Sequence, residues 1–161
     1  MVELTMDALA RESGVTRQTV HNLFGTKSGV LEALFDQLAL DAGLERMPTV
    51  MQQRDADSML SGFVEVFTDF WAKDRLLIRR IHGFAAIDPE FGAAVEARNR
   101  RRHMAATRIV QRIASDRSTE DKIAALWALT SFEFFDAVAE SCRDTKQAAG
   151  IVLALARKAL T

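Results

Sequence analysis

The chain has 161 residues, a length that fits one domain or a small domain joined to a larger one. Hydrophobic residues make up 48% and charged residues 27%, which is ordinary for a globular protein with a substantial core. The net charge of −1 excludes a globally basic protein, so any nucleic-acid-binding surface must be basic only locally. The single cysteine, Cys142, excludes an internal disulfide and favours a reducing, cytoplasmic setting, and no apolar run reaches the ~18 residues that a membrane span needs.

The first 45 residues predict a small helical domain in which glycines separate the helices. Three helices are expected, over about 6–13, 17–23 and 27–44. Thr5, Thr16 and Thr26 stand where N-cap residues are needed, and Gly14 and Gly25 end the first two helices.

Residues 46–161 predict a larger all-helical domain. The segment 46–57, which contains Pro48, is the expected linker. Longer amphipathic helices are predicted over about 56–81, 89–114, 119–141 and 145–160. The first of these has a candidate break at Lys73–Asp74, and the third has a start signal at Ser118 or Thr119. No alternating strand pattern is present, so the predicted fold class is all-α.

Residues 5–25 carry the spacing of a helix-turn-helix. Ala10 is small enough for a close helix crossing, Gly14 tolerates a positive φ in the turn, and Val20 is the branched apolar residue expected between the helices. The rest of a small core is expected from four further apolar residues, Leu9, Val15, Leu23 and Phe24. The alternative is an amphipathic helical hairpin with a solvated polar face.

The opposite face of the second helix carries side chains that can read DNA. Helical projection places four polar residues together: Arg17, Gln18, His21 and Asn22. Arginine suits guanine, and glutamine or asparagine suits adenine, so we predict that these four contact base edges. Thr19 lies beside this face, within reach of a phosphate.

The segment 4–39, "LTMDALARESGVTRQTVHNLFGTKSGVLEALFDQLA", resembles the DNA-binding domain of the TetR (tetracycline repressor) family of transcriptional regulators. The matching positions are Thr5, Ala10, Gly14, Val15, Thr16, Thr19, Val20, Phe24, Lys27, Leu31 and Leu34. The resemblance implies a helix-turn-helix domain over 1–45 and a ligand-binding and dimerisation domain over 46–161.

The resemblance also implies roles for individual residues. Thr16, Arg17 and Thr19 would begin the recognition helix near DNA, and Lys27 would open the next helix against a phosphate. His21 stands where the family commonly has an aromatic residue on the phosphate backbone, and histidine is a departure there. We therefore expect Thr16, Thr19 and Lys27 to contact phosphates of a palindromic double-stranded operator, with two recognition helices about 34 Å apart.

A second departure lies at the start of the chain, where only four residues precede Thr5 although the family has a complete helix there. We expect a first helix that is missing or truncated, which would expose Leu9, Val20 and Phe24. The alternatives are that the natural chain begins further upstream, that it was truncated, or that the DNA-binding domain over 1–45, called the head below, is incomplete. Residues 1–45 also hold seven acidic residues against three Lys or Arg, so basic charge is scarce.

Aromatic residues are frequent in the second domain, where the family encloses a small-molecule pocket. The expected lining is Phe67, Phe70, Trp71, His82, His103, Met104, Trp127 and Phe134. The alternative for any one of them is an ordinary place in the core.

The last two predicted helices are apolar on more than one face, so each must bury a second face. We expect a homodimer through 119–160, which resembles the family's four-helix interface. The alternative is a central helix of a monomeric bundle.

Other chemistry has weaker support. Gly25 and Lys27 lack the spacing and the preceding strand of a nucleotide-binding loop. The run 98–103, with four arginines and a histidine, is interpreted as a solvated, ion-paired helix face rather than a second nucleic-acid surface.

The three histidines lack metal-site spacing, and no catalytic constellation is evident, so we expect no metal, no cofactor and no enzyme. The predicted function is ligand-responsive transcriptional regulation, with repression relieved by a small-molecule effector. The alternative is a helical small-molecule-binding or interaction protein whose DNA-binding head is degenerate.

Overall fold

The computed structural model describes residues 5–113 and 119–161, and every regular element in these ranges is a helix, so the all-α prediction is confirmed. The helices are α1 (Met6–Glu12), α2 (Arg17–Phe24), α3 (Lys27–Asp41), the short 3-10 helix η1 (Leu44–Arg46), α4 (Met47–Met51), α5 (Ala56–Lys73), α6 (Arg75–Ala85), α7 (Pro89–Ile113), α8 (Thr119–Leu129), α9 (Phe132–Glu140) and α10 (Thr145–Leu160). The predicted helix end at Ala114 and the predicted start signal at Ser118 lie outside the described residues.

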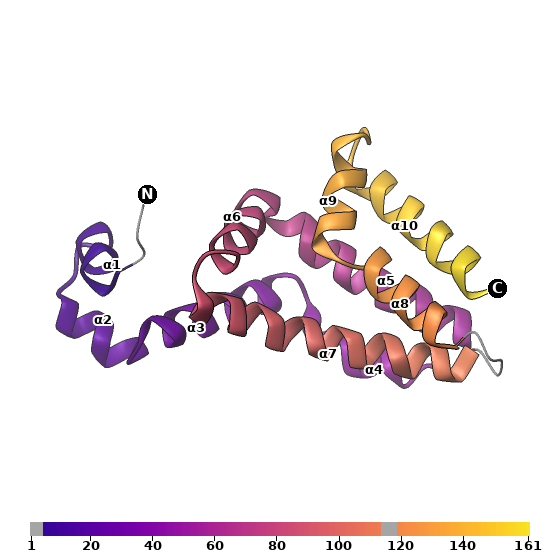
Figure 1. Cartoon of the computed structure of the whole chain (residues 1–161), viewed down its shortest axis with the longest axis horizontal. Coiled ribbons are helices and arrows are strands. Elements are labelled where there is room, and N and C mark those ends of the chain that lie inside the picture. The colour runs from indigo at the N-terminus through magenta and orange to yellow at the C-terminus, as the bar shows by residue number, and fades with distance from the viewer. Residues whose placement is uncertain (1–4, 114–118) are drawn as a thin grey trace.

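The molecule is elongated, with α1 and α2 at one end (Figure 1). Helix α3 leads from these two helices into the body, where α5 and α7 run along the long axis and α8, α9 and α10 occupy the far end. The described N-terminal end and the C-terminus therefore lie at opposite ends of the molecule.

The helix starts follow the capping residues that the sequence supplies. The side-chain oxygens of Thr5, Thr16 and Thr26 accept from backbone N–H groups three residues later, at 3.1 Å in each case. Asp74 caps α6 in the same way, through Leu77 N at 3.0 Å, so it separates α5 from α6 at the predicted break.

Two sequence predictions of helix boundaries were wrong. The expected linker 46–57 holds the end of η1, all of α4 and the start of α5, because Pro48 sits in the first turn of α4, where its missing N–H is tolerated. The expected single helix over 119–141 is divided into α8 and α9, because Ser131 caps the second of them through Phe134 N at 3.2 Å. The break leaves the Thr130 carbonyl to accept from Trp71 Nε1 at 3.0 Å.

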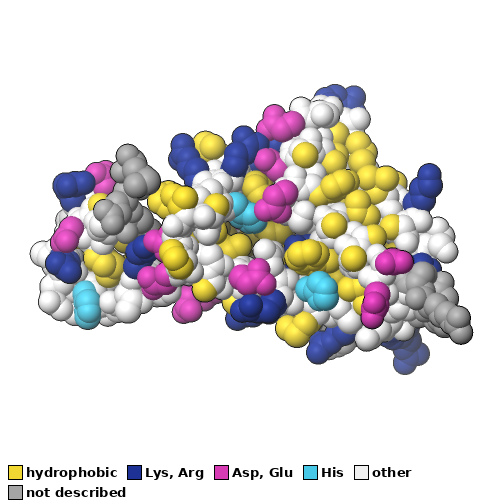
Figure 2. Space-filling view, viewed as in Figure 1, with side chains coloured by type: hydrophobic (Ala, Val, Ile, Leu, Met, Phe, Trp, Pro, Cys, Tyr) yellow, Lys and Arg dark blue, Asp and Glu magenta, His cyan; other side chains and the backbone are white. Residues whose placement is uncertain are grey.

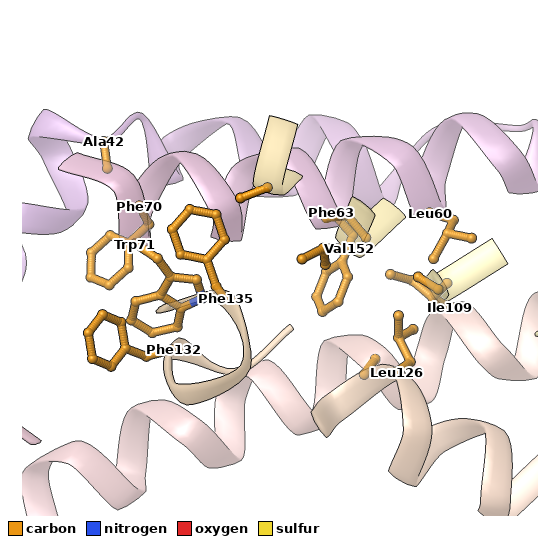
Figure 3. Packing of buried hydrophobic residues seen from close by; sticks show 14 of the residues in the cluster. Ala42, Leu60, Phe63, Phe70, Trp71, Ile109, Leu126, Phe132, Phe135 and Val152 are labelled. Carbon is orange, nitrogen blue, oxygen red and sulfur yellow. The ribbon is translucent and has the colours of Figure 1, made fainter. Parts of the chain in front are cut away.

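The core of the body lies between α5, α7, α8 and α10 (Figure 3). Phe63, Ile109, Leu126 and Val152, one from each of these helices, are fully buried. Each such side chain contributes about 2 kcal/mol through removal from water. These residues hold α5 and α7 as a fixed frame for the cavity described below.

The other end of the core is aromatic (Figure 3). Phe70 lies edge-on to Trp71 with ring centroids 4.8 Å apart, and Trp71 meets Phe132 of α9 at 5.6 Å. Trp71 is therefore fixed on both sides, as well as by its hydrogen bond to Thr130. None of the described helices is long and apolar enough to span a lipid bilayer.

Candidate functional site

Helices α1 and α2 meet at the positions that the sequence predicted. Ala10 and Val20 are 5% and 4% exposed, and Gly14 has a φ of +68°, which a glycine adopts without steric cost. Of the three residues expected to be exposed without a preceding helix, Val20 is buried, Leu9 is half-buried and Phe24 is exposed.

The predicted wider core of this region was wrong for three residues. Val15 is 42% exposed, Leu23 is 70% exposed and Phe24 is 37% exposed. Helices of seven and eight residues have one inward face each, and these three side chains are left exposed. Leu9 is half-buried, so the local core is small.

The polar face of α2 is open to solvent. The four residues expected to read bases, Arg17, Gln18, His21 and Asn22, are all exposed, and Thr19 beside them is half-buried. Local contacts order this face: Gln18 Nε2 donates to Asn22 Oδ1 at 2.7 Å, and the Thr16 and Thr19 hydroxyls lie 2.9 Å apart. Arg17 Nη1 lies 3.5 Å from Asp7 Oδ2 of α1. The exposed amides and guanidinium form a surface of hydrogen-bonding groups at one end of the molecule.

Lys27 differs from its predicted role. Its Nζ donates to Asp88 Oδ2, between α6 and α7, and lies 5.4 Å from the centre of the Phe91 ring. The hydrogen bond from Lys27 holds the pKa of the Asp88 carboxyl below its ordinary value. The lysine that was expected to meet a DNA phosphate is therefore bound to the body in this structure, because the start of α3 lies beside the α6–α7 connection.

The turn between α2 and α3 depends on two glycines. Gly25 has a φ of +70° and ends α2. Gly29 lies so close to the end of α2 that an added Cβ would stand 1.9 Å from the Phe24 carbonyl oxygen. The two glycines of the "GTKSG" segment thus fix the angle between α2 and α3.

A cavity of about 240 Å³ lies between α3, α5, α6 and α7. Four of the eight predicted ligand-contacting residues line it, namely Phe67, Phe70, Trp71 and His82. Phe35 and Ala39 of α3 form part of the wall, so the helix that carries α1 and α2 also touches the cavity. A mainly apolar hollow with a few polar groups is typical of small-molecule sites.

The other four predicted lining residues lie elsewhere. His103 and Met104 are exposed on α7 and border a shallow surface depression, because Arg102 takes the inward position of that turn. Trp127 is 38% exposed and packs edge-on to His103, with ring centroids 5.6 Å apart. Phe134 borders a groove between α9 and α10, since it lies on the face of α9 that points away from the cavity.

Arg102 was not singled out from the sequence, and it is the most unusual polar residue of the cavity wall. It is 3% exposed, although the run 98–103 was interpreted as a solvated face. Its Nη1 donates to the Trp127 carbonyl and to Thr130 Oγ1, the latter at 3.0 Å, and its Nη2 donates to Asn99 Oδ1 at 3.4 Å. Its Nε has no hydrogen-bond partner among the described residues. Burial lowers the pKa of Arg102 to about 10, so the guanidinium is charged at neutral pH.

Two further polar pairs border the cavity. His82 Nδ1 lies 2.7 Å from Glu133 Oε1 of α9, and this hydrogen bond lowers the pKa of the Glu133 carboxyl. Arg98 of α7 lies 3.4 Å from Asp36 of α3 and stacks over the Phe35 ring at 4.2 Å. The second pair ties α3 to α7 across the cavity wall.

Helices α8 and α10 carry apolar side chains toward solvent. Trp127, Ile151 and Leu155 are each between 38% and 39% exposed, and hydrophobic side chains gather over this end of the molecule (Figure 2). The opposite face of α10 is buried through Ala148, Val152, Ala156 and Leu160. Helix α10 is therefore apolar on two sides, and its outward side has no covering element among the described residues.

Within the described parts of the chain, no three His, Cys, Asp or Glu side chains come together to hold a metal ion. Comparisons with protein-family models, with curated proteins and with solved structures find no match for the chain.

Proposed function

We propose that the protein is a ligand-responsive DNA-binding regulator of the TetR type, acting as a repressor in the cytoplasm. The observation that carries this proposal is the exposed polar face of α2 at one end of the molecule, on a helix pair with the spacing of a helix-turn-helix. Arg17, Gln18, His21 and Asn22 would contact base edges, and Thr16 and Thr19 would contact phosphates.

The path from ligand to DNA runs through α3. Its first turn lies beside α2 and its middle supplies Phe35 and Ala39 to the cavity wall. A small molecule that favours one position of α3 changes the spacing of the two recognition helices in a dimer, and so shifts the population away from the DNA-binding state. Lys27 would leave Asp88 for a phosphate when DNA is bound.

The apolar outward sides of α8 and α10 support a homodimer through 119–160. In such a dimer, Ile151 and Leu155 would be buried against the same residues of a second copy. In the proposed regulator, the two-fold axis of this dimer would place two copies of α2 on one duplex, in successive major grooves about 34 Å apart.

A second candidate is a helical small-molecule-binding protein whose head does not bind DNA. The observations that favour it are ion pairs at all three basic side chains in 1–45: Arg11 with Glu12, Arg17 with Asp7 and Lys27 with Asp88.

The two candidates are separated by selection of binding sites from a random pool of DNA duplexes, followed by fluorescence anisotropy of the selected duplex at several salt concentrations. We expect an enriched palindrome, affinity that falls steeply with salt, and a loss of about 10- to 100-fold for Arg17→Ala. The exposed Arg54→Ala, in the loop after α4, is the matched control and is expected to bind like the unaltered protein. No enriched sequence and no salt-dependent binding would leave the second candidate.

A further inference from the structure

We infer that the cavity between α3, α5, α6 and α7 binds a small organic carboxylate whose apolar body fills the aromatic space while its carboxylate pairs with Arg102. Only the role of that molecule as the effector of DNA binding rests on the proposed function.

The first observation is that one edge of the Arg102 guanidinium has N–H groups available for a ligand. Nη1 is engaged twice, with the Trp127 carbonyl and the Thr130 hydroxyl, whereas Nη2 makes one long bond to Asn99 and Nε makes none among the described residues. Nε–H and the neighbouring Nη2–H together form the fork that binds the two oxygens of a carboxylate in parallel.

The second observation is that no carboxylate of the described residues forms an ion pair with this buried cation. Arg102 is 3% exposed, and Glu133, which attracts it from α9, is bound to His82 instead. Buried charges in proteins are normally paired, and a buried donor without a partner is rare. The pKa of Arg102, lowered by burial to about 10, leaves the positive charge in place at neutral pH.

The third observation is the charge of the wall as a whole. Among the described residues that line the cavity, three arginines stand against a single aspartate, and that aspartate is paired with Arg98. The wall therefore favours an anion over a cation. One fork suits a monoanion better than a phosphate, which carries more charge and needs more donors.

The rest of the cavity determines the size and the polarity of the remainder of the ligand. Apolar and aromatic side chains surround the space, with Phe67 and Trp71 from α5 and Ile78 from α6. An apolar cavity of about 150 Å³ holds benzene, so the 240 Å³ here accommodates a somewhat larger body, such as two fused rings or a medium-length alkyl chain. Inorganic anions and dicarboxylates would leave this apolar surface unfilled.

The test is isothermal titration calorimetry of the full chain with 2-naphthoate and octanoate, each compared with its neutral amide. We expect both carboxylates to bind at least 30-fold more tightly than their amides. Arg102→Met should remove that difference, and Arg102→Lys, which keeps the charge without the fork, should retain only part of it. Arg108→Met, an exposed arginine on the same helix outside the cavity, is the matched control and should leave the difference intact.

Equal affinity for acid and amide, or a carboxylate preference that survives Arg102→Met, overturns the inference. If no probe binds a protein whose circular dichroism shows it folded, the inference is overturned as well. DNA binding is measured separately on the same preparations. Failure to bind DNA with intact carboxylate binding refutes the proposed function alone, and salt-dependent DNA binding without carboxylate binding refutes this inference alone.

Discussion

Replacing Arg102 with methionine should leave the stability of the free protein nearly unchanged, although the side chain is almost fully buried. Burial lowers the pKa of Arg102 from its ordinary value to about 10, a difference that corresponds to a cost of about 3 kcal/mol for keeping the guanidinium charged in the fold. Because the folded pKa lies below the unfolded value, this cost is fully present at every pH below about 10. The hydrogen bonds to Trp127 and Thr130 offset it, at about 1.5–3 kcal/mol for each bond from a charged donor.

Methionine removes both the cost and these hydrogen bonds while keeping an apolar stem of similar length. Thr130 keeps its own bond to the Leu126 carbonyl at 2.8 Å, so its hydroxyl is not left without a partner. We therefore expect the free energy of unfolding, measured by urea denaturation at pH 7, to stay within about 1 kcal/mol of the unaltered protein. Replacing an arginine that forms a buried ion pair would lower the free energy of unfolding by about 3–5 kcal/mol. A loss of that size in Arg102→Met would refute the reasoning, since it would mean that a carboxylate of the chain neutralises Arg102.

Three other predictions address the head and the proposed interface. Asp88→Asn should release Lys27 and so raise the affinity for the selected duplex several-fold at pH 7. In fluorescence anisotropy, the slope of log affinity against log salt should steepen by about one, because one more cation contacts a phosphate. No change in this slope would contradict a phosphate role for Lys27. Because the folded-state pKa of Asp88 is lowered, its contribution to stability is present above about pH 4 and is lost as pH falls through the lowered pKa. Gly29→Ala should force α2 away from α3, since the new Cβ would stand 1.9 Å from a backbone oxygen. Amide hydrogen exchange should then become fast in α1 and α2 and stay slow in α5. Slow exchange in α1 and α2 of this variant would contradict the role of Gly29 in holding the two helices together. Ile151→Glu combined with Leu155→Glu should convert a dimer into a folded monomer in sedimentation experiments at micromolar concentration, and an unchanged mass would exclude this face as the interface.

The controls for these variants come from the same chain. Gly150→Ala lies in α10 with no atom within 4 Å of the added Cβ, so it should leave the head unaffected and stabilise the helix by up to about 1 kcal/mol. Arg54→Ala should leave both the DNA affinity and its salt dependence unchanged. Circular dichroism of the double glutamate variant separates loss of association from loss of fold.

Local signals in the sequence predicted most of the helix boundaries. Thr5, Thr16 and Thr26 each announce a helix start, because a hydroxyl that caps the first turn acts within three residues and needs no tertiary context. Ser131 carries the same signal. The apolar pattern continues across Ser131 and so predicts a single helix, although a capping serine there indicates the break between α8 and α9.

The cavity wall was predicted less completely, because periodicity does not say which face of a helix points inward when every face carries charge. Phe67, Phe70 and Trp71 share one side of α5 and were found together. The sequence groups Arg102 with the other arginines of an expected solvated face, and only the position of the end of α8 across from it makes it a buried residue. Its one signal in the sequence is the spacing from Ala105, Ala106 and Ile109, whose apolar stripe on α7 includes position 102.

The reading of DNA bases by α2 is tested most directly by comparing the binding sites selected by the unaltered protein and by Gln18→Ala. Gln18 is exposed on the polar face of α2, and its amide is bonded only to Asn22 among the described residues. The expected result is a palindrome in which the substitution relaxes the preference at one base pair in each half-site and leaves the other positions as they were. An identical consensus from both proteins, or no consensus from either, would contradict a recognition role for α2.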